Sequence, residues 1–189
     1  MILPIVKYGH PVLRKKGAKI EALTPEMVRL IADMYETMAS AKGVGLAAQQ
    51  VGRALQLAVI DVRDMEDRPS TLSFKGESAD VDSFMPLALV NPEIRPLGEC
   101  VTGPEGCLSF PEIYADVVRP ERIAVKAVDA KGRMLEFECG GLLARAIQHE
   151  YDHLQGILFI DRMSAQEKMG IKPELDDLQG ETKAELAAK

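Results

Sequence analysis

The sequence predicts a single α+β domain in which antiparallel or mixed β-strands surround one central helix. Two kinds of segment lead to this prediction. Stretches in which apolar residues recur every three or four positions indicate helices, and short apolar or alternating runs indicate strands. The chain has 189 residues, of which 47% are hydrophobic and 28% charged, so it is long enough for one domain with a hydrophobic core.

The first half of the chain contains one predicted helix and two predicted strands. Over 25–42, apolar residues recur at helical spacing, Thr24 precedes them as a candidate N-cap, and a glycine follows at position 43. Apolar runs over 55–62 and 87–90 indicate strands, and Asn91-Pro92 is expected to close the second. Between these strands, residues 63–86 are mostly polar without clear periodicity, so we expect a surface loop or insertion.

The second half begins with a predicted hairpin and continues into the central helix. Residues 123–128 and 134–137 have strand character, with the turn at 129–132. The central helix is expected over about 141–156. After residue 163 the sequence turns polar, and Pro173 is expected to interrupt any helix there. We therefore predict a domain over 1–163 and a polar tail over 164–189.

Charge and composition exclude several classes of protein. The net charge of −6 argues against nucleic acid as a partner. No apolar run approaches the roughly 18 residues of a membrane span, and the first residues do not resemble a secretory signal. Three cysteines without paired spacing suit a reducing compartment. We expect a cytoplasmic protein, with a bacterial cytoplasm as the best fit and an organelle as the alternative.

The segment His149–His153, HEYDH, carries the strongest chemical signal. Two histidines four positions apart on a helix lie on the same face and can bind one metal ion. Glu150 follows the first histidine, near enough to act on a metal-bound water without being a ligand. The plain alternative is a pair of ordinary histidines that flank a glutamate. Two of the chain's three histidines fall in this pattern, which favours metal binding.

A third ligand is predicted in the segment Glu105–Ser109, EGCLS. A catalytic site with two histidines needs one more protein ligand and an open position. The thiolate of Cys107 is a strong ligand for transition metals. The alternative for any of the three cysteines is a small buried hydrophobic residue. Neither Cys100 nor Cys139 has neighbours that argue against that alternative.

The segment Gly43–Gln50, GVGLAAQQ, is open to two interpretations. It could be a plain connection between helix and strand. It could instead offer a glycine-bearing backbone edge to an extended peptide, with a glutamine side chain that donates to a developing oxyanion. Phosphate binding is weakly supported, since the P-loop lysine and the full GxGxxG spacing are missing.

Together, GVGLAAQQ, EGCLS and HEYDH resemble the three signature segments of peptide deformylases, in the family's order and at comparable separations. Looser similarity extends from about Val6 to Arg162. The resemblance implies a metal-dependent hydrolase that removes the formyl group from the N-terminal methionine of nascent polypeptides. It implies Fe²⁺ as the native metal, which Zn²⁺, Ni²⁺ or Co²⁺ replaces in purified protein. Transient proximity to the ribosome would follow from such a substrate.

The resemblance also implies a role for each matching residue. The metal ligands would be Cys107, His149 and His153. Glu150 would be the general base and then the general acid, and the Gln50 amide with the Leu108 backbone N–H would stabilise the oxyanion. Backbone groups of the substrate would pair with Val44, Gly45 and Gly106. Leu142 and Val44 would line the pocket for the methionine side chain.

Three features depart from the family's commonest pattern. The stretch over 63–86 is longer than in compact members. Tyr114 stands where some members carry an arginine that contacts the peptide. The tail is acidic on balance, so docking on the ribosome through a basic helical tail is not expected.

Two other functions remain in competition at the level of the sequence. A zinc endoprotease or aminopeptidase would explain the paired histidines, although its third ligand usually lies downstream. A structural metal module would need a fourth protein ligand, and no other cysteine is obviously paired with Cys107.

Overall fold

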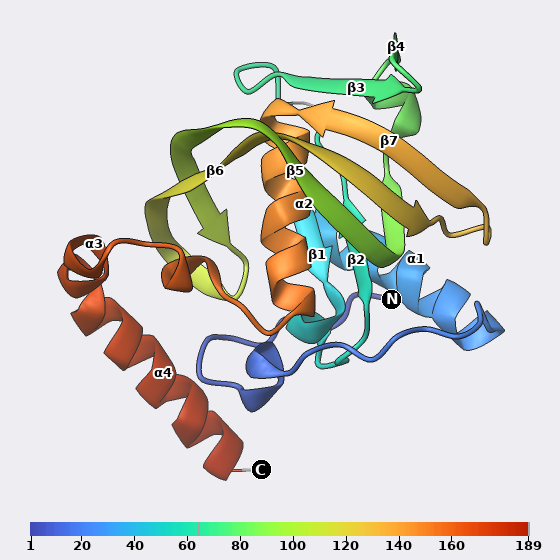
Figure 1. The fold of residues 1–189 in the computed structure, drawn as a ribbon. Helices are drawn as coiled ribbons and strands as arrows, with labels where there is room; N and C mark the ends of the chain where they lie inside the picture. The colour runs from blue at the N-terminus through green and yellow to red at the C-terminus, as the bar shows by residue number, and fades with distance from the viewer. Residues whose placement is uncertain (64, 189) are drawn as a thin grey trace.

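A long antiparallel sheet curls around one buried helix (Figure 1). The structure is a computed structural model that describes residues 1–63 and 65–188. Asp64 in the predicted 63–86 loop and Lys189 in the predicted tail lie outside the described residues. Seven strands of the described chain pair in the order β1-β2-β5-β6-β7-β3-β4, and every pairing between neighbouring strands is antiparallel. This agrees with the predicted α+β class.

The strands and helices have the following bounds. The strands are β1 Gly45–Ala47, β2 Leu57–Ile60, β3 Ser70–Phe74, β4 Glu77–Ser78, β5 Leu87–Cys107, β6 Phe110–Val128 and β7 Met134–Gly140. The α-helices are α1 Pro25–Ser40, α2 Gly141–Leu154, α3 Ala165–Gly170 and α4 Lys172–Ala187. Short 3-10 helices span Pro11–Arg14, Ala48–Val51, Asp82–Phe84 and Phe159–Asp161. None of the helices in the described ranges has the length and apolar character needed to cross a bilayer.

Helix α2 is the predicted central helix, and it ends two residues earlier than expected. Nearly all of its side chains are buried, as expected of a helix enclosed by a sheet. It begins at Gly141, whose φ of +67° is a conformation that favours glycine. A side chain there would also overlap the carbonyl oxygen of Pro69. This tight start fixes where the helix lies against the segment before β3.

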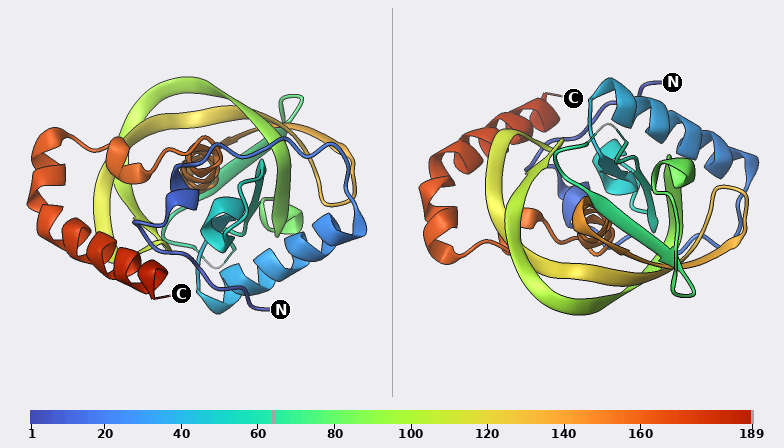
Figure 2. Two further views of the ribbon diagram at one scale, coloured as in Figure 1. Left: turned by 90° about the horizontal axis from the view of Figure 1, so that it is seen from below. Right: turned by 90° about the horizontal axis from the view of Figure 1, so that it is seen from above.

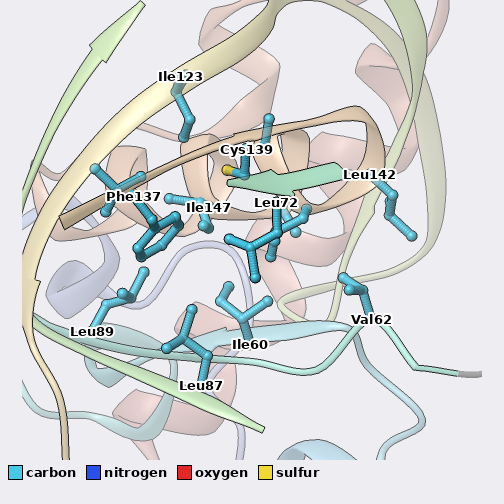
Figure 3. Close-up of a cluster of buried hydrophobic side chains, with 14 of the residues drawn as sticks. Ile60, Val62, Leu72, Leu87, Leu89, Ile123, Phe137, Cys139, Leu142 and Ile147 are labelled. Carbon is cyan, nitrogen blue, oxygen red and sulfur yellow. The ribbon is translucent and has the colours of Figure 1, made fainter. Parts of the chain in front are cut away.

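The largest apolar cluster lies between α2 and the sheet (Figure 3). Leu142 and Ile147 of α2 belong to it, together with side chains from the five strands β2, β3, β5, β6 and β7. Those labelled in Figure 3 are Ile60, Val62, Leu72, Leu87, Leu89, Ile123, Phe137 and Cys139. Because this core packs around α2, it fixes the position of the helix. The side chains that α2 carries are therefore held in fixed positions as well.

Helix α1 covers a second apolar cluster over β1 and β2. Met34 and Met38 are almost fully buried there against Leu46 and Leu57. The predicted N-cap is confirmed, because the Thr24 hydroxyl accepts a hydrogen bond from the Met27 N–H at 3.3 Å. The helix ends at residue 40, and the glycine-rich segment that forms β1 follows shortly after it.

The expected end of a strand at Asn91-Pro92 is wrong, because β5 continues to Cys107. The register between β5 and β6 shifts between Val90 and Glu93, as in a β-bulge. Asn91 adopts a φ of +50°, and its side chain exchanges two hydrogen bonds of 2.8 and 2.9 Å with the Ile20 backbone. The bulge bends the strand without ending it, so β5 and β6 wrap around α2 (Figure 2).

The expectation of a loop over 63–86 is also wrong in part. β3 lies in this stretch and pairs with β7, and Leu72 points into the main core. Lys75 and Gly76, both at positive φ, form the two-residue connection to β4. The sequence pattern did not predict β3, because only one of its five residues, Leu72, is buried. Its sequence therefore shows little alternation of apolar and polar residues.

The predicted hairpin is confirmed, since β6 and β7 pair up to Val128 and Met134 around the turn at 129–132. The expectation that Pro173 interrupts a helix is wrong. Pro173 lies in the first turn of α4, where its missing N–H costs no hydrogen bond. Leu175 of α4 is buried in a third apolar cluster with Val12 and Phe110. The division at residue 163 remains a prediction.

Candidate metal centre and active site

The structure brings together Cys107, His149 and His153. Their ligand atoms all lie within 4.8 Å of one another, and the Cys107 Sγ is 3.3 Å from the His153 Nε2. The two histidines are one turn apart on α2, and Cys107 is the last residue of β5. One thiolate and two imidazoles at such separations fit a tetrahedral transition-metal ion with one open position. The cluster therefore has the donors of a catalytic metal site.

Glu105 orients the first of these histidines. Its Oε1 is 2.9 Å from the His149 Nδ1, so the other ring nitrogen is left for the cluster. Burial acts to raise the pKa of Glu105, but hydrogen bonds with Arg119 and His149 hold the pKa well below its usual range. Glu105 is therefore a carboxylate that accepts the Nδ1 proton.

A buried network of charges extends from Glu105. Arg119 donates to both Glu105 oxygens at 2.6 and 2.8 Å and to Asp152 at 2.9 Å, and Arg145 donates to Glu105 at 2.9 Å. Arg162 completes the network at Asp152. Sequence reasoning missed all of these residues as site components. Glu105 and Asp152 lie inside the recognised motifs, but the arginines give no local signal.

Glu150 faces the same space from α2. It is only 4% exposed, its Oε2 has no hydrogen-bond partner among the described residues, and burial raises its pKa to about 7. A side chain at Gly45 would lie 2.9 Å from the Glu150 Cγ and Cδ. Glycine at this position thus lets the carboxyl group approach β1. A carboxyl group with such a pKa can both accept and release a proton near neutral pH.

The amide of Gln50 is held in one orientation. Its Oε1 accepts the Ala47 N–H at 2.9 Å, so its Nε2 points toward the Cys107 Sγ at 3.5 Å and the Ser109 hydroxyl at 3.3 Å. Gln50 lies in the 3-10 helix after β1 and is 1% exposed. An N–H donor is therefore fixed beside the cluster of possible ligands.

The N-terminal segment ties both sides of this region together. The Val6 N–H donates to the Gln50 carbonyl and the Tyr8 N–H to the Ser109 carbonyl, each at 2.9 Å. The Lys7 Nζ donates to the Leu108 carbonyl at 3.0 Å. These bonds fix Gln50 relative to the end of β5.

A cavity of about 520 Å³ opens in front of the cluster. Nine of the predicted site residues line it, namely Val44, Gly45, Gln50, Gly106, Cys107, Leu108, Leu142, His149 and Glu150. His153 is buried behind them and does not line the cavity. β1 is an edge strand, and beyond Val90 β5 no longer pairs with β2, so each has an edge that no other described strand pairs with.

Several residues line the cavity that sequence reasoning did not assign. Lys7, Lys42 and Arg68 are cations from three separate segments. Tyr114, the residue that departs from the family pattern, is 72% exposed, and its ring packs over Gly106. Arg68 belongs to the stretch expected as a loop, so that stretch contributes to the cavity wall.

The sequence and the fold match known proteins over nearly the whole chain. A family model described as polypeptide deformylase matches residues 2–169. A peptide deformylase of Methylacidiphilum infernorum is 52% identical over 178 residues, covering 94% of this chain and 93% of that protein. One from Opitutus terrae is 46% identical over 186 residues, covering 97% and 96%.

Solved structures give the same result. A crystal structure of a variant of Arabidopsis thaliana peptide deformylase 1B has a TM-score of 0.83 at 35% identity, covering 98% of this chain and 94% of that one. A peptide deformylase from Legionella pneumophila has a TM-score of 0.78 at 37% identity, covering 100% and 99%.

Proposed function

The chain belongs to the polypeptide deformylase family, and we propose that the family's reaction takes place in the cavity beside Cys107, His149 and His153. It is an enzyme that removes the formyl group from the N-terminal methionine of nascent polypeptides and releases formate. The observation that carries the assignment of the site is the convergence beside one cavity of three metal-ligand side chains, an oriented amide and a carboxyl group whose Oε2 has no hydrogen-bond partner in the described part of the chain.

Cys107, His149 and His153 would hold one divalent cation. Their donor atoms lie close enough to bind the same ion. Glu105 orients the His149 ring through a hydrogen bond at its Nδ1. When bound, such a cation supplies Lewis acidity, which polarises the formyl oxygen and makes water more acidic. The cavity leaves space on the open side of the cluster for the formyl group.

Glu150 moves the proton in this proposal. Its carboxyl group takes a proton from the attacking water and then delivers it to the leaving amine, as the C–N bond of the formamide breaks. A pKa raised to about 7 by burial suits both steps. Its unpartnered oxygen leaves the group free to act on water in the cavity.

Gln50 and Leu108 stabilise the negative charge that develops on the formyl oxygen. The Gln50 Nε2 is aimed at the cluster because its oxygen is occupied by Ala47. The backbone N–H of Leu108 follows directly after the ligand Cys107. Donors fixed before the reaction cost no reorganisation, and loss of one typically lowers turnover by on the order of 100-fold or more.

The remaining predicted residues bind the substrate. A peptide in extended form would pair with backbone groups of Val44 and Gly45 on one wall and Gly106 on the other. Leu142, 5% exposed and lining the cavity, and Val44 form the apolar pocket for the methionine side chain. Both walls belong to strand edges that no other described strand covers.

Formate release from a formyl-Met-Ala-Ser peptide tests the reaction. The protein is purified without oxygen, and metal is assayed in the same sample. We expect formate in step with loss of the formylated peptide, and no cleavage of unformylated Met-Ala-Ser. Cleavage of peptide bonds without formate would instead favour a metallopeptidase.

We propose Fe²⁺ as the native metal, with Zn²⁺, Ni²⁺ or Co²⁺ able to replace it. The family resemblance supports iron, and mixed thiolate and imidazole donors accommodate all four ions. Iron beside the partly exposed Cys107 thiolate is open to oxidation, so activity should decay in air and nickel or cobalt should protect it. Equal turnover per metal for zinc and iron forms, without decay in air, would show that the iron assignment is wrong.

We also propose that the enzyme works in the cytoplasm, near ribosomes, because its substrate is nascent. Three free cysteines agree with a reducing compartment. Cosedimentation with translating and empty ribosomes tests the proximity, and binding that survives deletion of 164–189 would agree with the expectation that the tail is not the docking element.

A further inference from the structure

The lining of the cavity includes several cations although the protein is acidic overall. Lys7, Lys42 and Arg68 line it, whereas the net charge of the chain is −6. None of the three forms an ion pair with a carboxylate in residues 1–63 and 65–188. Arg145, the other lining cation, is paired with Glu105. Glu112 is the exposed acidic residue among those that line the cavity.

Arg68 is fixed on one wall of the cavity. Its Nη2 donates to the Pro104 carbonyl at 3.2 Å, which anchors the guanidinium on β5 three residues before the ligand Cys107. A guanidinium has five N–H donors, and those not bonded to Pro104 form no other hydrogen bond within residues 1–63 and 65–188. At about 3.3 Å per residue, an extended peptide with its formyl group at Cys107 would bring its second or third residue level with Pro104.

Lys42 lines the same cavity from a different segment of the chain. It follows α1 at a φ of +55° and comes three residues before Gly45 on β1. Its side chain is exposed at the cavity, while the next residues carry the backbone edge proposed to hold the substrate. Arg68 and Lys42 thus both line the cavity through which a peptide would leave the metal centre.

We propose that Arg68 and Lys42 are specificity-determining residues that favour formyl-Met peptides with a carboxylate at the second or third residue. This inference rests on the proposed function of the cavity. An acidic side chain gains from both cations, and a basic one is repelled by them. Arg68 is supplied by the 63–86 stretch, so this stretch contributes substrate recognition as well as structure.

The test compares formyl-Met peptide amides that differ in one side chain. Asp, Asn or Lys is placed at the second residue in one series and at the third in the other, with alanine elsewhere. Asn matches the shape of Asp, so their ratio isolates the charge. We expect kcat/KM to fall in the order Asp, Asn, Lys in at least one series, by roughly threefold per cation at low ionic strength. The ratio should shrink as salt is added.

Variants then assign the effect to residues. Arg68→Gln and Lys42→Gln should each reduce the Asp-to-Asn ratio, and the double variant should bring it close to one. Arg68→Glu should favour the Lys peptide. Lys183→Gln is the matched control, because it removes one exposed cation from α4 outside the cavity. It should keep the wild-type ratio.

The outcomes separate this inference from the function on which it rests. Equal kcat/KM for all peptides, or a wild-type ratio in the double variant, overturns the role of Arg68 and Lys42 while deformylation stands. Absence of formate from every formylated peptide overturns the proposed function itself. A normal thermal unfolding curve for each variant shows that a lost ratio is not a folding defect.

Discussion

Cys107 and Cys100 lie on the same strand, β5, but in different surroundings. Cys107 touches His153 at 3.3 Å, whereas Cys100 is exposed. We predict that Cys107→Ala abolishes stoichiometric metal binding, because two imidazoles alone hold a transition metal weakly. Cys100→Ala should keep both metal and turnover. Metal analysis of the two purified variants checks this, and a metal-replete, active Cys107→Ala protein would remove Cys107 from the site.

Glu150 sits next to one metal ligand without belonging to the cluster of ligand atoms. We predict that Glu150→Gln retains metal but loses turnover by two orders of magnitude or more, because an amide cannot accept the proton. The isosteric change keeps the fit beside Gly45. Glu138→Gln, at an exposed position of β7, is the control and should behave as wild type. Loss of metal together with activity would instead make Glu150 a ligand.

How much of the site could be predicted depends on whether its parts are local in sequence. His149 and His153 were predictable because helical geometry alone puts them on one face. Arg119 was not, because its partners Glu105 and Asp152 are 14 and 33 residues away. They meet only when β5 and β6 pair and curl around α2. Gln50 and Cys107 likewise come close together only in the folded chain. The role predicted for Gln50 therefore depended on the family resemblance.

At the scale of elements, strand β3 shows what sequence patterns miss. Its central residue Leu72 is 4% exposed and lies in the main core. We predict that Leu72→Ala lowers the free energy of unfolding by about 2–5 kcal/mol, through lost burial and the cavity left behind. Thr71→Ala, at the exposed neighbouring position, should change it by about 0.5 kcal/mol or less. Urea unfolding measures both, and equal small effects would mean that β3 is dispensable.

Helix α1 and the hairpin were predictable because each is specified by local pattern and turn chemistry. The full length of β5 was not, since Asn91-Pro92 is usually a turn signal. Only the hydrogen bonds of the Asn91 side chain with Ile20, 71 residues away, make it a bulge. The prediction for Pro173 was wrong for a related reason, because the effect of proline depends on its position. A proline in the interior of a helix breaks it, whereas a proline in the first turn, as in α4, is well tolerated.

At the scale of the whole molecule, the core does not depend on the metal. The side chains of α2 are buried by the sheet along its length, and the ligands occupy one part of it. We predict that removing metal leaves the protein folded, and that metal at 100 times its Kd adds about 2.7 kcal/mol of stability. For a chain of this size Tm should rise by about 5–10 °C. Calorimetry with and without metal measures the shift. Cys107→Ala should show none, and unfolding of the metal-free protein would contradict the prediction.

Stability should also fall on the acid side. In the folded protein, the pKa values of Glu105, Asp129 and Asp161 lie below their usual range. Burial acts to raise each pKa, but hydrogen bonds with arginines and backbone N–H groups lower it by more. A carboxyl group with a lowered folded pKa contributes stability above its unfolded pKa, near 4, and that contribution is lost as pH falls through the folded value. We therefore predict that the free energy of unfolding decreases steadily below about pH 4.

The salt bridge between Asp161 and Arg14 isolates one part of this acid dependence. It joins the 3-10 helix after α2 to the one near the N-terminus. Asp161→Asn should lower the free energy of unfolding at neutral pH. It should also make that free energy fall less steeply below pH 4, because unfolding then takes up one fewer proton in this pH range. Glu138→Gln removes an exposed carboxyl group that forms no ion pair in the described chain, and it should leave the slope unchanged. Urea unfolding between pH 2.5 and 7 compares them, and an Asp161→Asn slope equal to that of wild type would show that the Asp161 carboxylate does not contribute to acid unfolding.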